Sequence, residues 1–442
     1  MLWLIVLSVI FYLIYYKIIK PSTYWKKRHV ASLESWSAIK SEYDFIFKRK
    51  SFSDFILDLY KKFDNERYFG VFHFTRPVLY IRDVDLVKKI TVKDFNHFVD
   101  RTTVINHETD PFFSKSLSNL KGQRWRNMRA TLSPSFTSSK VKFMFPLLLD
   151  CAEKFTNHFI EKKEKVYEME MKDAFTRFTN DAIATAAFGL KCNSFEDKTN
   201  EFYMMGKGIT TSGKIRAAAI ILQHVFPKLA KLLNIRFIPT SVTNFFYRIV
   251  KETINVREQT DLVRPDMIHL LMEARKGKQQ LDNNTTIDTG FATVEESKVH
   301  HFDHKQQVEL SDEDITAQAL IFFIAGFHSA SSLMCFITYE LALNSNVQEK
   351  LQKEVDETLA ECNGKLTYEA LHRMEYLDMV VSETLRKWPP GFRLDRICIQ
   401  NYLIEPVTPK EKPLLIEKGT AVVIPVIGFH RSEEYFPDPQ KF

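Results

Sequence analysis

A carboxylate and a guanidinium three positions apart, Glu383 and Arg386, stand in a stretch with helical character. Residues with this spacing share one face of a helix, so the two side chains can form an ion pair or share a partner. An exposed pair of this kind contributes only about 0.3–0.5 kcal/mol. The spacing alone is therefore weak evidence for a function, and its meaning depends on the residues around it.

Hydrogen-bond donors of two kinds come together at Trp125 and Arg129, four positions apart in a second helical stretch. That spacing places an indole N–H and a guanidinium on one helical face. Both groups only donate hydrogen bonds, so the face suits a carboxylate. A surface arginine beside a half-buried tryptophan is the plainer interpretation, and without further context it is preferred.

Small and polar residues interrupt a long apolar stretch at Ala325, Gly326, His328 and Ser329. A glycine inside a helix costs about 1 kcal/mol relative to alanine, so it usually marks a distortion or a close approach. A hydroxyl and an imidazole can relay protons near neutral pH. A histidine that is simply buried in the core is an equally good interpretation of the same pattern.

The elements that must position these residues are mostly helices. Ser311, followed three residues later by an acid, predicts the start of a helix whose residues 315–343 are apolar on nearly every side. Such a helix is expected to be buried on every side. A further helix is predicted at 375–387, a β-hairpin at 69–82, and short strands between 393 and 426. These patterns indicate a mainly α protein with a smaller β region.

The N-terminal residues 1–19 contain one charged side chain, Lys17. About 18 helical residues span roughly 27 Å, close to the thickness of a bilayer core. Basic residues follow the apolar stretch, which places the body of the protein in the cytosol. The sequence therefore predicts a transmembrane anchor at 1–19 and a linker with the start of the body at 20–50. A buried core helix is the alternative.

Composition excludes some classes of function. Lys and Arg number 61 against 55 Asp and Glu, a net charge of +6 without a dense basic run, so nucleic acid is not a predicted partner. Five cysteines are scattered and odd in number, which indicates reduced thiols rather than a disulfide framework. His300, His301 and His304 form a small cluster without nearby cysteines or suitably spaced carboxylates, and we predict no metal site there.

The order of these motifs resembles that of the cytochromes P450. The resemblance rests on the helix that carries Glu383 and Arg386, on the strands after it, and on the phrase YFPDPQKF at residues 435–442. An aromatic-rich body and a long polar loop look like the insect-type microsomal members. The resemblance implies the P450 fold, mainly α with a smaller β region, as a catalytic domain at 51–442, and heme b (iron protoporphyrin) as cofactor.

The resemblance also implies roles for the donor residues. In the family, the residues that match Glu383 and Arg386 form a buried ion pair that locks the haem-side core. Those that match Trp125 and Arg129 bind a haem propionate. Arg396 matches another position that meets a propionate in related microsomal enzymes.

Ala325 and Gly326 match the family segment that opens a groove for dioxygen, and the next two positions depart from its pattern. The family supplies an acid and a threonine for proton delivery, where this chain has His328 and Ser329. Serine keeps the hydroxyl, and imidazole can relay protons. Oxygen activation could therefore persist, be less coupled to product formation, or be lost.

The family places its FxxGxRxCxG loop, which supplies the thiolate ligand of the iron, beyond the YFPDPxKF phrase, and this sequence ends at Phe442. None of the five cysteines has that context, so no axial ligand is predicted among them. A thiolate ligand favours O–O cleavage, which makes its position decisive for competence. We favour a piece of a longer enzyme; a non-catalytic, membrane-anchored remnant is the alternative.

The implied activity is a haem-dependent monooxygenase that inserts one atom of O2 into a lipophilic substrate, either xenobiotic or endogenous. NADPH would supply the electrons through NADPH–cytochrome P450 reductase, with cytochrome b5 as a further candidate partner. The expected location is the endoplasmic reticulum membrane, with the catalytic body on the cytosolic side. In this family Phe112, Phe113 and residues 237–246 fall where the substrate channel is lined, but aromatics there are more often core, so no substrate is predicted.

Overall fold

The structure of the chain is a computed structural model, which describes residues 20–33, 51–73, 76–102, 110–161, 166, 168–210, 222, 227–233, 235–276, 310–409 and 411–442. The predicted anchor at 1–19 and the cluster of His300, His301 and His304 lie outside these residues. The chain divides into two compact units. The sheet unit comprises Met1–Val104, Lys214–Ile235 and Gly391–Lys441, and the helical unit comprises Ile105–Gly213 and Arg236–Pro390 with Phe442.

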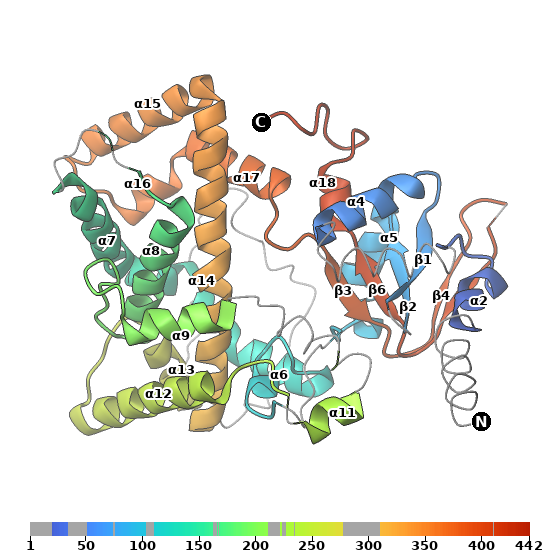
Figure 1. Ribbon diagram of the computed structural model, residues 1–442, viewed down its shortest axis with the longest axis horizontal. Coiled ribbons are helices and arrows are strands. Elements are labelled where there is room, and N and C mark those ends of the chain that lie inside the picture. Colours follow the sequence, from blue (N-terminus) through green and yellow to red (C-terminus); the bar gives the residue numbers. More distant parts are fainter. Residues whose placement is uncertain are drawn as a thin grey trace, which may run out of the picture. The chain divides into compact units, whose positions relative to one another are not determined.

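A four-stranded sheet with the order β1-β2-β6-β3 forms the centre of the sheet unit (Figure 1). Its first two strands form the predicted antiparallel hairpin, β6 runs parallel to β2, and β3 runs antiparallel to β6. A second sheet pairs β4 with β5. The strands are β1 Tyr68–His73, β2 Arg76–Ile81, β3 Leu394–Ile397, β4 Tyr402–Ile404, β5 Leu414–Ile416 and β6 Ala421–Ile424.

Short helices complete the sheet unit. α4 buries Ile56 and Leu59 in a cluster with sheet residues, and Gly428 of α18 lies so close to the Tyr60 ring that a side chain there would overlap it. The glycine therefore allows α18 to pack on α4. The helices are α2 Lys20–Lys27, α4 Phe52–Lys62, α5 Val84–Lys88, η2 Lys89–Lys93, η3 Phe95–His97, α11 Pro227–Leu232 and α18 Val426–His430.

Helices alone build the described part of the helical unit, and α14 is its longest element (Figure 1). With the sheets of the other unit, this confirms a mainly α protein with a smaller β region. The helices are η4 Phe113–Lys115, α6 Gly122–Leu132, η5 Ser133–Phe136, α7 Ser138–Ile160, α8 Met171–Ala186, α9 Glu201–Thr210, α12 Thr240–Thr260, α13 Met267–Arg275, α14 Asp312–Leu343, α15 Ser345–Glu361, α16 Tyr368–His372 and α17 Glu375–Lys387.

The start of α14 follows the sequence prediction. Ser311 Oγ accepts a hydrogen bond from Asp314 N at 3.2 Å, and the Asp314 carboxylate accepts one from Ser311 N at 3.1 Å. Two of the N–H groups that a helix leaves without an internal partner are thereby satisfied. This reciprocal cap determines where the helix begins.

The burial of α14 differs from the prediction. The helix is buried on every side only at residues 315–320. Farther along, Phe323 and Phe327 are buried, whereas Ala325 and His328 are exposed. Helices α8, α9 and α12 contact α14, and so do η4, α13, α15 and α17. Apolar composition determines which residues can be buried, but the number of neighbouring elements decides which of them are.

By length and composition, α14 is also the one described helix that could cross a membrane. Its contacts with α8, α12 and α17 are those of a core helix. The core around it is rich in aromatics: Phe113 stacks on Phe237 with ring centroids 6.1 Å apart, and Phe246 contacts Phe323. The aromatic residues expected near the substrate channel thus include plain core residues.

Candidate cofactor site

The pair Glu383 and Arg386 forms a two-pronged ion pair on α17. Arg386 Nε donates to Glu383 Oε2 at 2.7 Å, and Nη2 donates to Oε1 at 2.6 Å. The arginine is buried, while 36% of the glutamate side chain is exposed. Two parallel charge-assisted bonds give the pair a fixed geometry. The role implied for this pair, locking the haem-side core, remains a prediction.

A second polar contact, which sequence reasoning missed, ties the end of α17 to α14. The buried carboxylate of Glu340 on α14 accepts hydrogen bonds from Lys387 Nζ at 3.0 Å and from Trp388 Nε1 at 2.6 Å. The Trp388 ring also stacks on Phe336, with centroids 4.6 Å apart. One signal was present in the sequence, because Glu340 is the only acidic residue in the apolar stretch 315–343.

Gly326 marks a close approach between α14 and α8. A Cβ atom at this position would lie 2.9 Å from Ile183 Cδ1 of α8, too near without a shift of the neighbour. One residue farther along, Thr179 Oγ1 of α8 donates to the Phe327 carbonyl oxygen at 3.0 Å. Of the two explanations that a helical glycine permits, close approach is the one seen, and α14 continues through it.

His328 and Ser329 sit one turn after Ala325, on a part of α14 that is not fully buried. Ser329 Oγ donates to the Ala325 carbonyl oxygen at 2.5 Å. Partial burial, and then the positive charge of Lys172, lower the pKa of His328 below its ordinary value. Both effects disfavour the imidazolium form, so the imidazole is a weaker base than a fully solvated one. By the exposed fraction of its surface His328 is not a core histidine, although it is partly covered by its neighbours.

α6 presents Trp125 and Arg129. Met128 and Leu132 bury one face of the helix in the core, which leaves Trp125 half-buried beside them and Arg129 exposed. The helical geometry brings the indole and the guanidinium to one face, as their spacing predicts. The face can donate hydrogen bonds to a carboxylate.

Arg396 on β3 is a half-buried cation that forms no ion pair with a carboxylate among the described residues, although the charge of Asp395 acts to raise its pKa. Its Nη1 donates to the Asp395 carbonyl oxygen at 2.9 Å, and its Nε is buried with no hydrogen-bond partner in the described part of the chain. The Asp395 carboxylate accepts instead from Thr102, whose N–H is 2.6 Å away. Burial, and then the charge of Arg101, lower the pKa of Arg396 to about 10.

This arrangement fits the cofactor that the sequence implies. A desolvated guanidinium next to a second arginine is unfavourable unless an anion pairs with it. A haem propionate would supply that anion and accept the N–H of Arg396 Nε. Arg101 was missed by sequence reasoning, since no spacing connects it to Arg396.

The predicted site residues are divided between the two units. Ala325, Gly326, His328 and Ser329 share α14 in the helical unit. The same unit holds the α6 pair and the α17 pair, whereas Arg396 belongs to the sheet unit. That all three propionate-binding residues converge on one haem remains a prediction.

Comparison with known proteins identifies the family. The cytochrome P450 family model matches residues 43–442. Cytochrome P450 9e2 of Blattella germanica is 40% identical over 435 residues, which cover 95% of this chain and 78% of the relative. Probable cytochrome P450 9f2 and cytochrome P450 6a2, both of Drosophila melanogaster, are 39% and 35% identical over 408 and 401 residues. These matches cover 90% and 89% of this chain, and 75% and 74% of the relatives.

The resemblance inferred from the motifs is confirmed by these comparisons, as are its fold and its haem cofactor. Members of the family generally work with redox partners and lipophilic substrates. The similarity to microsomal insect members indicates association with a membrane. The family model matches residues 43–442, and relatives from two insects are 34–40% identical to this chain. The chain belongs to the cytochrome P450 family of haem-dependent monooxygenases and is of the insect type.

Proposed function

We propose that the protein inserts one atom of O2 into a lipophilic xenobiotic or endogenous compound, using electrons from NADPH delivered by a reductase. Residues 1–19 anchor it in the endoplasmic reticulum membrane, with the catalytic body on the cytosolic side. The apolar character of residues 1–19 and the basic residues after them support this orientation. Family membership supports the chemistry.

The observation that supports the proposal is the half-buried guanidinium of Arg396, which forms no ion pair within the part of the chain that the structure describes. Its lowered pKa, and its buried Nε, which has no hydrogen-bond partner among the described residues, support binding of a carboxylate of a bound molecule. On α6, the Trp125 indole N–H and the Arg129 guanidinium are also hydrogen-bond donors that suit a carboxylate. Bound haem supplies the redox centre at which dioxygen is activated.

Ser329 and His328 of α14 are the residues that would deliver protons. Ser329 Oγ, which donates to the Ala325 carbonyl oxygen in this structure, could instead donate its proton to an acceptor in the site if the hydroxyl rotated. The neutral His328 imidazole has one ring N–H donor and one ring nitrogen acceptor, so it can pass on a proton, and its lowered pKa favours release of that proton. Gly326 supports both by letting α14 pack directly on α8.

Isotope incorporation tests the proposed activity. Protein expressed from the natural transcript, reconstituted with NADPH–cytochrome P450 reductase, is supplied with 18O2 and a panel of lipophilic compounds. The proposal predicts products that carry one 18O atom and whose formation requires NADPH. Products whose added oxygen comes from water would contradict it, and an absence of turnover with every compound would favour the non-catalytic alternative.

Replacing Ser329 by alanine is expected to lower product formation by about 100-fold, because a positioned proton donor is lost. The free energy of unfolding should change by less than about 0.5 kcal/mol, since alanine is the better helix former. Product formation per NADPH consumed and thermal unfolding are measured side by side. Thr338→Ala removes the same kind of bond, from Thr338 Oγ1 to the Met334 carbonyl oxygen, and should leave product formation unchanged. Equal losses in both variants would contradict the role given to Ser329.

A further inference from the structure

A lysine at the start of α8 holds the turn of α14 that carries His328. Lys172 Nζ donates to Ser331 Oγ at 2.7 Å, to Ser332 Oγ at 2.8 Å and to the His328 carbonyl oxygen at 3.3 Å. An ammonium group has three protons, and these three acceptors use all of them. No carboxylate forms an ion pair with Lys172 within the described residues, so its direct hydrogen-bond partners are neutral groups of α14.

Two successive carbonyl groups of α14 receive side-chain donors as well as backbone ones. The His328 carbonyl oxygen also accepts from Ser332 Oγ at 2.7 Å. The Phe327 carbonyl oxygen accepts from Ser331 Oγ at 2.9 Å and from Thr179 Oγ1 at 3.0 Å. Side-chain donors of this kind compete with the hydrogen bonds of the helix itself. The geometry of this turn therefore depends on what α8 donates to it.

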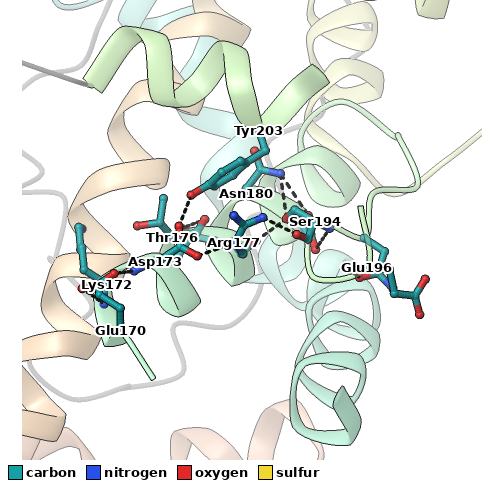
Figure 2. Close-up of polar contacts among 12 residues, drawn as sticks. Glu170, Lys172, Asp173, Thr176, Arg177, Asn180, Ser194, Glu196 and Tyr203 are labelled. Carbon is teal, nitrogen blue, oxygen red and sulfur yellow. Dashed lines mark hydrogen bonds and ion pairs between the residues drawn. The ribbon is translucent and has the colours of Figure 1, made fainter. Parts of the chain in front are cut away.

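α8 is itself held firmly, so Lys172 reaches α14 from a fixed point (Figure 2). Glu170 caps the helix by accepting from the backbone of Lys172 at 3.0 Å. Asp173 accepts from Arg177 Nε at 2.7 Å and from the Tyr203 hydroxyl at 2.8 Å. Arg177 in turn donates to the Ser194 carbonyl oxygen at 2.5 Å. These bonds connect α8 to α9 and to the segment between them.

The charge of Lys172 also acts on the imidazole. Burial lowers the pKa of Lys172 itself, while Cys335 and Glu170 act to raise it. Lys172 is the charged group that acts on His328 and lowers its pKa, after burial. Within the described residues, helices α9, α12, α13, α15 and α17 bring no charged side chain that shifts the His328 pKa.

We propose that Lys172 is a positioning residue for proton delivery: its ammonium fixes the His328–Ser332 turn of α14 and places a positive charge beside His328. The inference rests on the proposed function of His328 and Ser329. Lys172 is placed to act through the helix rather than on the substrate. Its contribution can be measured on the protein without a bound cofactor.

Three variants separate the charge of Lys172 from its hydrogen bonds. K172R keeps charge and donors, K172Q keeps donors without charge, and K172M removes both. The His328 titration midpoint is followed by NMR of the imidazole protons and assigned with H328Q. We expect the midpoint to rise in K172Q and K172M and to stay near the wild-type value in K172R. Amide exchange at residues 328–332 should accelerate by at least about 10-fold in K172M, because charge-assisted hydrogen bonds are lost.

Lys154 offers a matched control, because this exposed lysine pairs with Asp150 one turn away on α7. K154M should leave both readouts unchanged. An identical His328 midpoint in wild type, K172R and K172Q would overturn the proposal, and that comparison holds even if K172M fails to fold. If the His328 titration midpoint rises in K172Q and K172M but the protein fails the 18O2 test, the inference about Lys172 stands and the proposed function is wrong.

Discussion

Replacing Asp266 by alanine is expected to lower the free energy of unfolding by about 3–5 kcal/mol, because it leaves a buried arginine without its counter-charge. Arg257 donates to the two Asp266 oxygens at 2.7 and 2.5 Å, and the two side chains are 4% and 0% exposed. Asp266 also caps α13 by accepting from His269 N at 3.0 Å. The variant therefore loses a buried ion pair and a helix cap together.

Urea unfolding followed by circular dichroism measures this effect. Asp150→Ala provides the control, since its pair with Lys154 is more than half exposed on both sides. That variant should change the unfolding free energy by less than about 1 kcal/mol. A loss for Asp266→Ala as small as the control would show that Arg257 finds another partner or reaches solvent.

The substitution Gly189→Ala is expected to cost about 2–5 kcal/mol, although it adds a single methyl group. Gly189 has φ +71°, a conformation that side chains rarely adopt. A Cβ there would also overlap the guanidinium of Arg257 and lie 2.7 Å from Asp266 Oδ2. Backbone strain and displacement of the buried ion pair add to each other at this one position.

Gly364→Ala separates the two contributions. Gly364 has φ +76°, but a Cβ there would meet nothing within 4 Å. Its alanine variant should therefore show the backbone cost alone, about 1–2 kcal/mol. Thermal unfolding of both variants under the same conditions gives the comparison. Equal losses would mean that the ion pair near Gly189 adjusts to the methyl group without cost.

Local signals in the sequence predicted the elements of the fold well. The acid three residues after Ser311 marked the start of α14, because a capping box involves only neighbouring residues. The end of α15 is also local, since Asn363 and Gly364, which follow it, both adopt positive φ. The pair at Glu383 and Arg386 formed because helical spacing alone brings those side chains together.

Long-range contacts could not be predicted, because no sequence pattern reports them. Lys172 and Ser331 are 159 positions apart, and their hydrogen bond depends on how α8 packs on α14. The buried contact of Glu340 with Trp388 spans 48 positions and depends on where α17 ends. The burial of α14 was overestimated for the same reason, since its composition does not reveal which neighbours cover it.

The missing partner of Arg396 could not be inferred from its sequence either. A neighbouring aspartate, Asp395, suggests a counter-charge, but its carboxylate is engaged by Thr102. The structure is needed to show that Arg396 forms no ion pair with Asp395 or with any other described carboxylate. Replacing Arg396 should therefore preserve or increase the stability of the haem-free protein while it weakens haem binding.

The central claim is that Arg396 is arranged for a haem carboxylate, and Arg396→Met tests it most directly. Haem retention and unfolding are measured on protein expressed from the natural transcript, with and without haem. The haem-free variant should be at least as stable as the wild type, because a buried charge without a carboxylate is removed. Its haem affinity should fall by about 10–100-fold, because a charge-assisted bond to the propionate is lost.

Arg67→Met is the matched control, since Arg67 pairs with Asp83 at 2.9 Å and Glu411 at 2.7 Å in the same unit. That variant should lose stability while its folded fraction keeps its affinity for haem. For Arg396→Met, the account predicts unchanged or increased stability of the haem-free protein together with weakened haem binding. A loss of stability like that of Arg67→Met, with haem affinity unchanged, would contradict it.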